Sequence, residues 1–155
     1  MKVKLMTHTG FVVSNLERSL EFYRDLLGLK VKRSGILGGE FNSKALGYSG
    51  VRLNKANLSI GDTGHEIELV QYLNPEGGNV APIARNAVGA SHLGLVVDNL
   101  DSLRGALEAK GAKFAGPPAV DPGAEYPNVW KSCYVQDPDG NWLEIAERAP
   151  DQKNG

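Results

Sequence analysis

An internal repeat constrains the fold of this chain more than any other feature of its sequence. Residues 8–16 read HTGFVVSNL and residues 92–100 read HLGLVVDNL, so that a histidine, a glycine, two valines, an asparagine and a leucine recur in the same places. Each segment runs into an amphipathic stretch, residues 15–27 or 99–110, that ends at a glycine. Glycine commonly follows the last turn of a helix because it adopts a positive φ readily. The repeat therefore predicts two modules of the same architecture.

Both amphipathic stretches are predicted to be helices, because each places its leucines on one face. In the first, Ser14 and Glu17 fit the pattern of a capping box. In the second, Asp98 or Asn99 can cap the first turn.

Short strand-like segments follow each helix. They cover residues 29–34, 51–60 and 66–72 in the first half, and residues 112–115, 131–136 and 142–146 in the second. The sequence Asp137-Pro138-Asp139-Gly140 is a strong turn signal and predicts that the last two strands form a hairpin. Each half is therefore predicted to be βαβββ, and the fold class to be α+β.

The two modules are predicted to form one domain. Residues 74–89 contain two prolines and three glycines without strand periodicity, and are predicted to be the connector. Module one then spans about residues 5–73, module two about residues 90–147, and residues 148–155 form a flexible tail. A module of roughly 70 residues buries little core alone, so the two are expected to pair.

Composition narrows the classes of partner. The chain has 17 basic and 18 acidic residues and a formal charge of −1, which gives no electrostatic reason to expect nucleic acid or an anionic membrane. Cys133 is the single cysteine, so no internal disulfide forms, and this buried-strand thiol is expected to be inert. No apolar run approaches the roughly 18 residues that span a bilayer, and the start of the chain lacks a signal-peptide pattern. We expect a cytoplasmic protein.

Four polar residues occupy matched positions in the two modules. Side chains alternate between the faces of a strand, so His8 and His92 point away from the bulky residues that pack under the helices. Glu68 and Glu144 each stand between two apolar residues in the last strand of a module, and therefore face the same side as the histidines. Burying these carboxylates unpaired would cost several kcal/mol. A divalent cation held by all four groups would compensate them.

Two other polar residues of the same region compete for this role. Glu66 has the parity of Glu68 and is its main competitor as a ligand, although it corresponds to Trp142 in the second module. His65 has the opposite parity and no counterpart, and is left out of the site.

The chain resembles the vicinal oxygen chelate superfamily, which includes glyoxalase I and methylmalonyl-CoA epimerase. The likeness covers about residues 5–147 and rests on His8, on NLERSLEFY at residues 15–23, LLGL at residues 26–29, HLGLVV at residues 92–97 and DPDGNWLE at residues 137–144. The resemblance implies paired βαβββ modules whose mixed sheets form a cupped, half-open barrel with the helices outside. It also implies one divalent metal ion, Ni, Co, Mn, Fe or Zn, held by a ligand set carried over as His8, Glu68, His92 and Glu144.

The ligand set favours the lyase and isomerase branch of the superfamily, because Glu68 supplies a fourth protein ligand. Two positions depart from glutathione-dependent glyoxalases, which tend to carry arginine where this chain has Val12 and asparagine where it has Tyr72. Epimerases often have histidine where this chain has Ser91, although PIAR at residues 82–85 is similar to them. We therefore expect a glyoxalase-like or epimerase-like reaction on a small carbonyl or thioester compound.

The catalytic residue is expected to be Glu144, with Glu68 as alternative or counterpart, acting as both metal ligand and general base. Substrate contacts are predicted for Arg52, preferred over Lys55 on the same strand, and for Trp142. Residues 35–50 and 116–128 are predicted to be loops that wall or cover the cavity.

Two alternatives stay open, an extradiol-type dioxygenase and a non-catalytic protein of the antibiotic-binding, bleomycin-resistance kind. The four polar positions argue against both. The resemblance also implies a homodimer.

Overall fold

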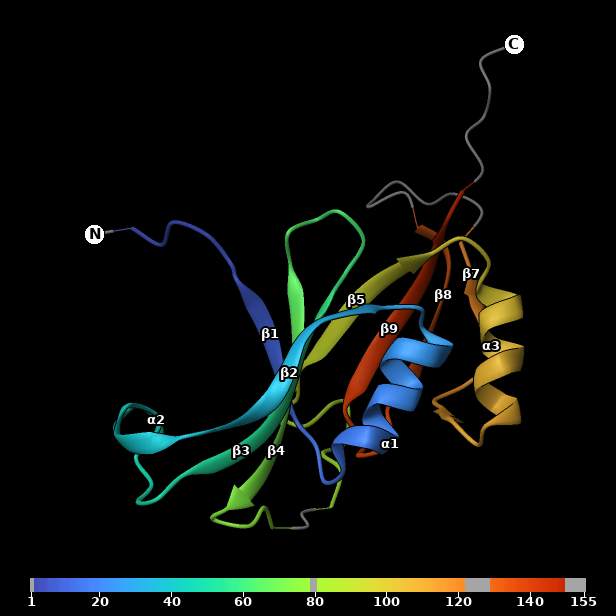
Figure 1. Ribbon diagram of the computed structural model, residues 1–155. Coiled ribbons are helices and arrows are strands. Elements are labelled where there is room, and N and C mark those ends of the chain that lie inside the picture. The colour runs from blue at the N-terminus through green and yellow to red at the C-terminus, as the bar shows by residue number, and fades with distance from the viewer. Residues whose placement is uncertain (1, 79–80, 122–128, 150–155) are drawn as a thin grey trace. The chain divides into compact units, whose positions relative to one another are not determined.

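The computed structural model describes residues 2–78, 81–121 and 129–149. The chain divides into two compact units, Met1–Ala81 and Pro82–Gly155, which we call unit 1 and unit 2. Each unit has its own sheet and its own helical segment (Figure 1). The predicted α+β class is confirmed.

Unit 1 contains a four-stranded sheet in the order β1-β4-β3-β2. β1 runs parallel to β4, and the other neighbours are antiparallel. Its elements are β1 (His8–Val12), α1 (Leu16–Leu20), the π-helical turn η1 (Glu21–Leu26), β2 (Lys30–Gly38), α2 (Gly39–Leu46), β3 (Arg52–Ser59) and β4 (Glu66–Asn74).

Unit 2 repeats this order as β5-β9-β8-β6, again with its first and last strands parallel. The short strands β6 and β7 both pair with β8 and together take the place that β2 has in unit 1. Its elements are β5 (His92–Val97), α3 (Leu100–Ala109), β6 (Lys113–Phe114), β7 (Ala119–Val120), β8 (Val129–Gln136) and β9 (Trp142–Arg148). The predicted βαβββ repeat is therefore present in both units.

The helix that follows the first strand of each unit, α1 or α3, begins at an asparagine. The Asn15 side chain accepts a hydrogen bond from the Arg18 backbone N–H, and the Asn99 side chain accepts one from the Ser102 N–H. The capping box predicted at Ser14 and Glu17 is wrong by one residue. Asn99, one of the two predicted caps of the second helix, is confirmed.

The strand face that packs under each helix is apolar. In unit 1, α1 contacts β3 and β4, and Tyr23 from η1 stacks on Phe11 with ring centroids 6.1 Å apart. Phe11 and Val13 are buried while Val12 between them is exposed, as the predicted alternation requires. The core of this face is completed by Leu16, Leu20, Ala56, Leu58, Ile67 and Leu69, and in unit 2 by Leu100, Leu107, Leu143 and Ile145.

Two predicted loops contain regular structure. Residues 35–50 continue β2 to Gly38 and then form α2, which ends at Gly47 with a φ of 74°. Residues 116–128 include β7, while residues 122–128 lie outside the described part of the chain. The prediction of a loop at residues 35–50 is therefore wrong, while the role of this segment as a wall or lid stays a prediction. A flexible tail was predicted for residues 148–155, of which 150–155 are not described.

The hairpin between β8 and β9 is confirmed. Asp137 is buried, and its carboxylate accepts hydrogen bonds from the backbone N–H groups of Asp139 and Asn141.

Cys133 in β8 is buried too, and burial raises the pKa of its thiol. Among the described residues, no helix is long and apolar enough to cross a lipid bilayer.

Candidate functional site

In unit 1, the parallel pairing of β1 with β4 brings His8 and Glu68 together. Gly10 is opposite Glu68 in the register, which places the histidine two residues earlier on the same face. The His8 Nε2 atom lies 3.7 Å from Glu68 Oε2. The Nδ1 atom of His8 is 2.9 Å from the Thr7 hydroxyl. A Cβ added at Gly10 would meet no described atom within 4 Å, so the glycine leaves this pair open.

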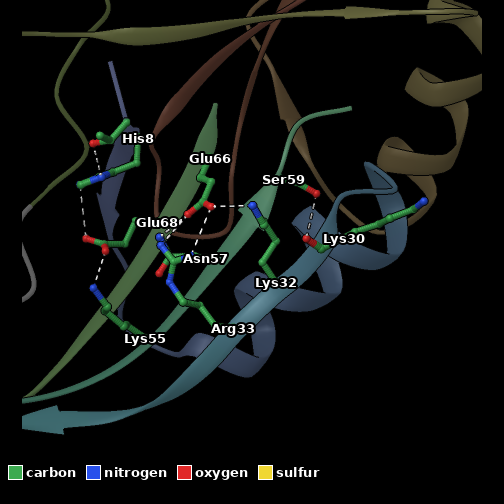
Figure 2. A network of polar contacts seen from close by, with 10 residues as sticks. His8, Lys30, Lys32, Arg33, Lys55, Asn57, Ser59, Glu66 and Glu68 are labelled. Carbon is green, nitrogen blue, oxygen red and sulfur yellow. Dashed lines mark hydrogen bonds and ion pairs between the residues drawn. The ribbon is translucent and has the colours of Figure 1, made fainter. Parts of the chain in front are cut away.

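The other carboxylate oxygen of Glu68 accepts a hydrogen bond from the Lys55 ammonium group (Figure 2). Lys55 comes from β3 and is three-quarters shielded from solvent. Arg52, at the start of β3, is exposed. The cation beside the predicted site in unit 1 is therefore Lys55, and substrate contact by Arg52 stays a prediction.

Glu66 has separate partners on the same face. Its carboxylate is 2.7 Å from an Arg33 nitrogen, 3.1 Å from Lys32 Nζ and 3.0 Å from Asn57 Nδ2. Lys32, and then Arg33, hold the pKa of the Glu66 carboxyl below its ordinary value against the opposing effect of burial. Figure 2 shows the two carboxylates with these different partners. Glu66 is thus paired with cationic side chains of its own sheet, while Glu68 lies beside His8.

The third histidine lies elsewhere. His65 Nε2 is 3.0 Å from the Thr9 hydroxyl, and Thr9 is on the strand face opposite to His8. This contact agrees with the prediction, made from the alternation of side chains along the strand, that His65 lies outside the candidate site.

Unit 2 places His92 and Glu144 in the equivalent arrangement. Gly94 is opposite Glu144 in the parallel register of β5 and β9, and His92 Nε2 lies 3.5 Å from Glu144 Oε2. Tyr134, directly across from Glu144 on β8, donates its hydroxyl to the same carboxylate oxygen at 3.1 Å. Its hydroxyl oxygen is also 3.4 Å from His92 Nε2. Burial, followed by the hydrogen bond to Glu144, raises the pKa of Tyr134 and keeps it a proton donor.

A cation and an aromatic side chain flank this pair. The Arg85 guanidinium carbon lies 4.7 Å from the centre of the Tyr134 ring and 5.4 Å from that of the Trp142 ring. Trp142 is half-buried and its indole N–H donates to the Ile83 carbonyl, while substrate contact by Trp142 stays a prediction. Sequence analysis singled out neither Tyr134 nor Arg85. A count across the predicted turn at residues 137–140 would have placed Cys133 opposite Glu144, because the connection between the paired residues Gln136 and Trp142 is one residue longer than that turn.

The donor atoms of each pair suit a metal ion. Imidazole nitrogen and carboxylate oxygen bind divalent metals at about 2.0–2.2 Å, so two donors of one ion stand within roughly 4.2 Å of each other. Both His–Glu pairs meet this limit, and Glu68 turns a different oxygen to Lys55 than to His8. Within the described ranges, no group of three or more His, Cys, Asp or Glu side chains is close enough to hold an ion. Each unit by itself therefore offers two ligands.

Comparison with known proteins gives one consistent result. The sequence profile described as the Glyoxalase/Bleomycin resistance protein/Dioxygenase superfamily matches residues 5–145. The Bacillus subtilis protein YwbC is 27% identical over 149 residues, which cover 94% of this chain and 98% of YwbC. A protein of Synechocystis named as a probable lactoylglutathione lyase is 25% identical, with 92% of this chain and 94% of the relative covered.

A solved structure has the same fold. The crystal structure of a glyoxalase family protein from Bacillus cereus superposes with a TM-score of 0.84 at 24% identity, and covers 97% of both chains. At this level of identity the likeness supports the architecture alone.

Proposed function

Because the chain belongs to the glyoxalase, bleomycin resistance protein and dioxygenase superfamily, we propose that it is a metal-dependent lyase or isomerase that moves a proton beside the carbonyl group of a small molecule. The observation that carries the proposal is the pair of equivalent His–Glu contacts, one in each unit, at 3.7 and 3.5 Å. The relative from Synechocystis, whose name contains lactoylglutathione lyase, supports the lyase branch.

His8, Glu68, His92 and Glu144 would hold one divalent ion, Ni, Co, Mn, Fe or Zn. This set of two nitrogens and two oxygens would suit a divalent ion that also accepts a chelating substrate. When bound, the ion would act as a Lewis acid that stabilises negative charge on the substrate oxygen. In the tautomer whose Nδ1–H donates to the Thr7 hydroxyl, the His8 Nε2 atom, 3.7 Å from Glu68 Oε2, carries a lone pair and is available as a ligand.

Glu144 is the residue we assign to proton transfer. Its Oε2 atom accepts the Tyr134 hydroxyl, which fixes the orientation of the carboxylate. The carboxylate retains further lone pairs, so it can take a proton from carbon and return it. Glu68 is less suited to this role because the Lys55 ammonium occupies one of its oxygens while the other lies beside His8.

The test is the variant Glu144→Gln, in protein loaded with Co²⁺ or Ni²⁺. Proton exchange at carbon is followed by NMR in deuterated water with a panel of α-hydroxy carbonyl compounds and acyl-CoA thioesters. The amide oxygen can still act as a ligand, so the bound metal should remain near the wild-type content. Exchange should fall by about 10²- to 10⁴-fold, the usual contribution of a general base.

Glu17→Gln, at an exposed position of α1, is the matched control and should retain wild-type exchange. Wild-type rates in Glu144→Gln would remove Glu144 from this role. Absence of exchange from metal-loaded wild-type protein with the whole panel would contradict the proposed reaction.

A further inference from the structure

The segment that begins unit 2 is fixed on the β8–β9 hairpin at two points. Pro82 lies against Gly140, where an added Cβ would come within 2.7 Å of the proline ring. One residue later, the Ile83 carbonyl accepts the Trp142 indole N–H at 3.1 Å. Gly140 has a φ of 90°, so both the turn and the close approach require glycine. These contacts determine where Arg85, two residues further along, is held.

The Arg85 guanidinium is held over two aromatic rings. It lies over Tyr134, whose hydroxyl contacts Glu144, and over Trp142, two residues before Glu144 on β9. A guanidinium that stacks on rings keeps the N–H groups at its edges available, and these edges match the oxygens of a carboxylate or phosphate. Arg85 and the Glu144 carboxylate therefore both contact Tyr134, Arg85 over its ring and Glu144 at its hydroxyl.

No acidic side chain among the described residues pairs with Arg85. The ion pairs among the described residues of unit 2 join Arg104 to Glu108, Lys131 to Asp101 and, when the imidazole is protonated, His92 to Glu144. A cation that is exposed, positioned by its neighbours and not neutralised is suited to bind an anion from solution.

We propose that Arg85 binds an anionic group of the substrate, a carboxylate or a phosphate, beside the Tyr134 ring whose hydroxyl contacts Glu144. The placement of the reacting carbon at Glu144 rests on the proposed function, whereas the binding of the anion to Arg85 does not. The inference assigns the substrate class: a small carbonyl compound that also carries a carboxylate or phosphate group.

The experiment compares three α-hydroxy carbonyl probes: dihydroxyacetone phosphate, hydroxypyruvate and the neutral dihydroxyacetone. Binding of each probe is measured by calorimetry, and proton exchange by NMR in deuterated water. For an anion that Arg85 binds, Arg85→Gln should raise Kd about 10- to 100-fold, as expected for loss of a bidentate charge-assisted contact. The ratio of exchange on that anion to exchange on dihydroxyacetone should fall by the same factor. Arg85→Lys should be intermediate because it keeps the charge without the planar fork.

Arg148→Gln, at an exposed arginine of β9, is the matched control and should keep the wild-type Kd. Whichever anion depends on Arg85 identifies the group as carboxylate or phosphate. Equal Kd values in wild type and Arg85→Gln, or no binding of either anion to wild type, would overturn the inference. If Arg85→Gln weakens binding while wild-type protein exchanges none of the probes, the proposed reaction fails and the anion site stands.

Discussion

Glu66 and Glu68 stand two residues apart on one face of β4, and their neighbours give them different roles. Lys32, Arg33 and Asn57 surround Glu66, whereas Glu68 lies between Lys55 and His8. Glu66 is therefore an internal anion of the sheet that ties β2 to β3 and β4.

The pKa of Glu66 gives a prediction about stability. Because its folded pKa is lower than the unfolded value of about 4.3, ionised Glu66 stabilises the folded state above that pH. This contribution is lost as the pH falls through the folded pKa. Glu66→Gln should therefore lower the free energy of unfolding at pH 7, and the difference from wild type should shrink below about pH 4. Denaturant unfolding between pH 3 and pH 7 measures it.

Added salt should reduce the same difference, because Lys32 and Arg33 are more than half exposed. Glu40→Gln, which removes the exposed partner of Lys44 in α2, is the control and should leave stability almost unchanged at every pH. A difference for Glu66→Gln that is constant from pH 3 to pH 7 would show that packing, and not charge, makes Glu66 stabilising.

At this scale the sequence predicted which face a side chain occupies and not which partner it meets. Alternation along single strands was enough to place His8 with Glu68 and His92 with Glu144 on the strand faces opposite the helices. The contacts of Lys55 with Glu68 and of Tyr134 with Glu144 depend on register between strands, which alternation within one strand leaves open. For this reason, the preference for Arg52 over Lys55 as a substrate contact did not predict that Lys55 contacts Glu68.

Among the elements, α1 and α3 are each joined to the last strand of their sheet in the same way. The Leu16 N–H donates to Gln71 of β4, and the Leu100 N–H donates to Glu147 of β9. Gln71 and Glu147 each come three residues after the candidate metal ligand of their strand. The asparagine cap and this cross-element bond together satisfy donors that a helix start leaves free.

Asn15→Ala should therefore lower the free energy of unfolding by about 1 kcal/mol, the usual value of a helix cap. Ser14→Ala removes the hydroxyl that accepts from the Arg18 side chain at the surface and should change it by less than about 0.5 kcal/mol. Both are measured by urea unfolding at pH 7. A larger loss for Ser14→Ala than for Asn15→Ala would restore the capping box that the sequence suggested.

Local pattern leaves the start of α1 ambiguous, because Ser14 and Asn15 are both good caps. The hydrogen bond from the Leu16 N–H to Gln71 favours Asn15 as the cap, and it joins residues 55 positions apart.

α2 was not predicted for another reason. None of its residues is buried, so it carries no apolar stripe, and its ends are set by Gly38 and Gly47.

For the whole molecule, the repeat predicted two sheets of one topology, and both were found. The two halves have different neighbours around their equivalent His–Glu pairs, a lysine in unit 1 and a tyrosine with an arginine in unit 2. Such divergence is expected if one half stabilises a fixed charge and the other handles the proton and the substrate. Duplication identifies equivalent positions and gives no information about neighbours that differ between the copies.

Under the proposed function, the ion requires ligands from both units, and this requirement gives a prediction about stoichiometry. Wild-type protein should bind one divalent ion per chain, and His8→Ala or His92→Ala should each weaken binding by at least about 10-fold. Ion at 100 times its Kd should stabilise the wild-type fold by about 2.7 kcal/mol, and the two variants by much less. Elemental analysis and thermal unfolding with and without a chelator measure these effects.

His65→Ala, which changes the histidine that contacts Thr9, is the control and should bind metal as wild type does. Two ions per chain, or full binding by either site variant, would mean that each pair acts alone and would remove the shared centre on which the reaction depends.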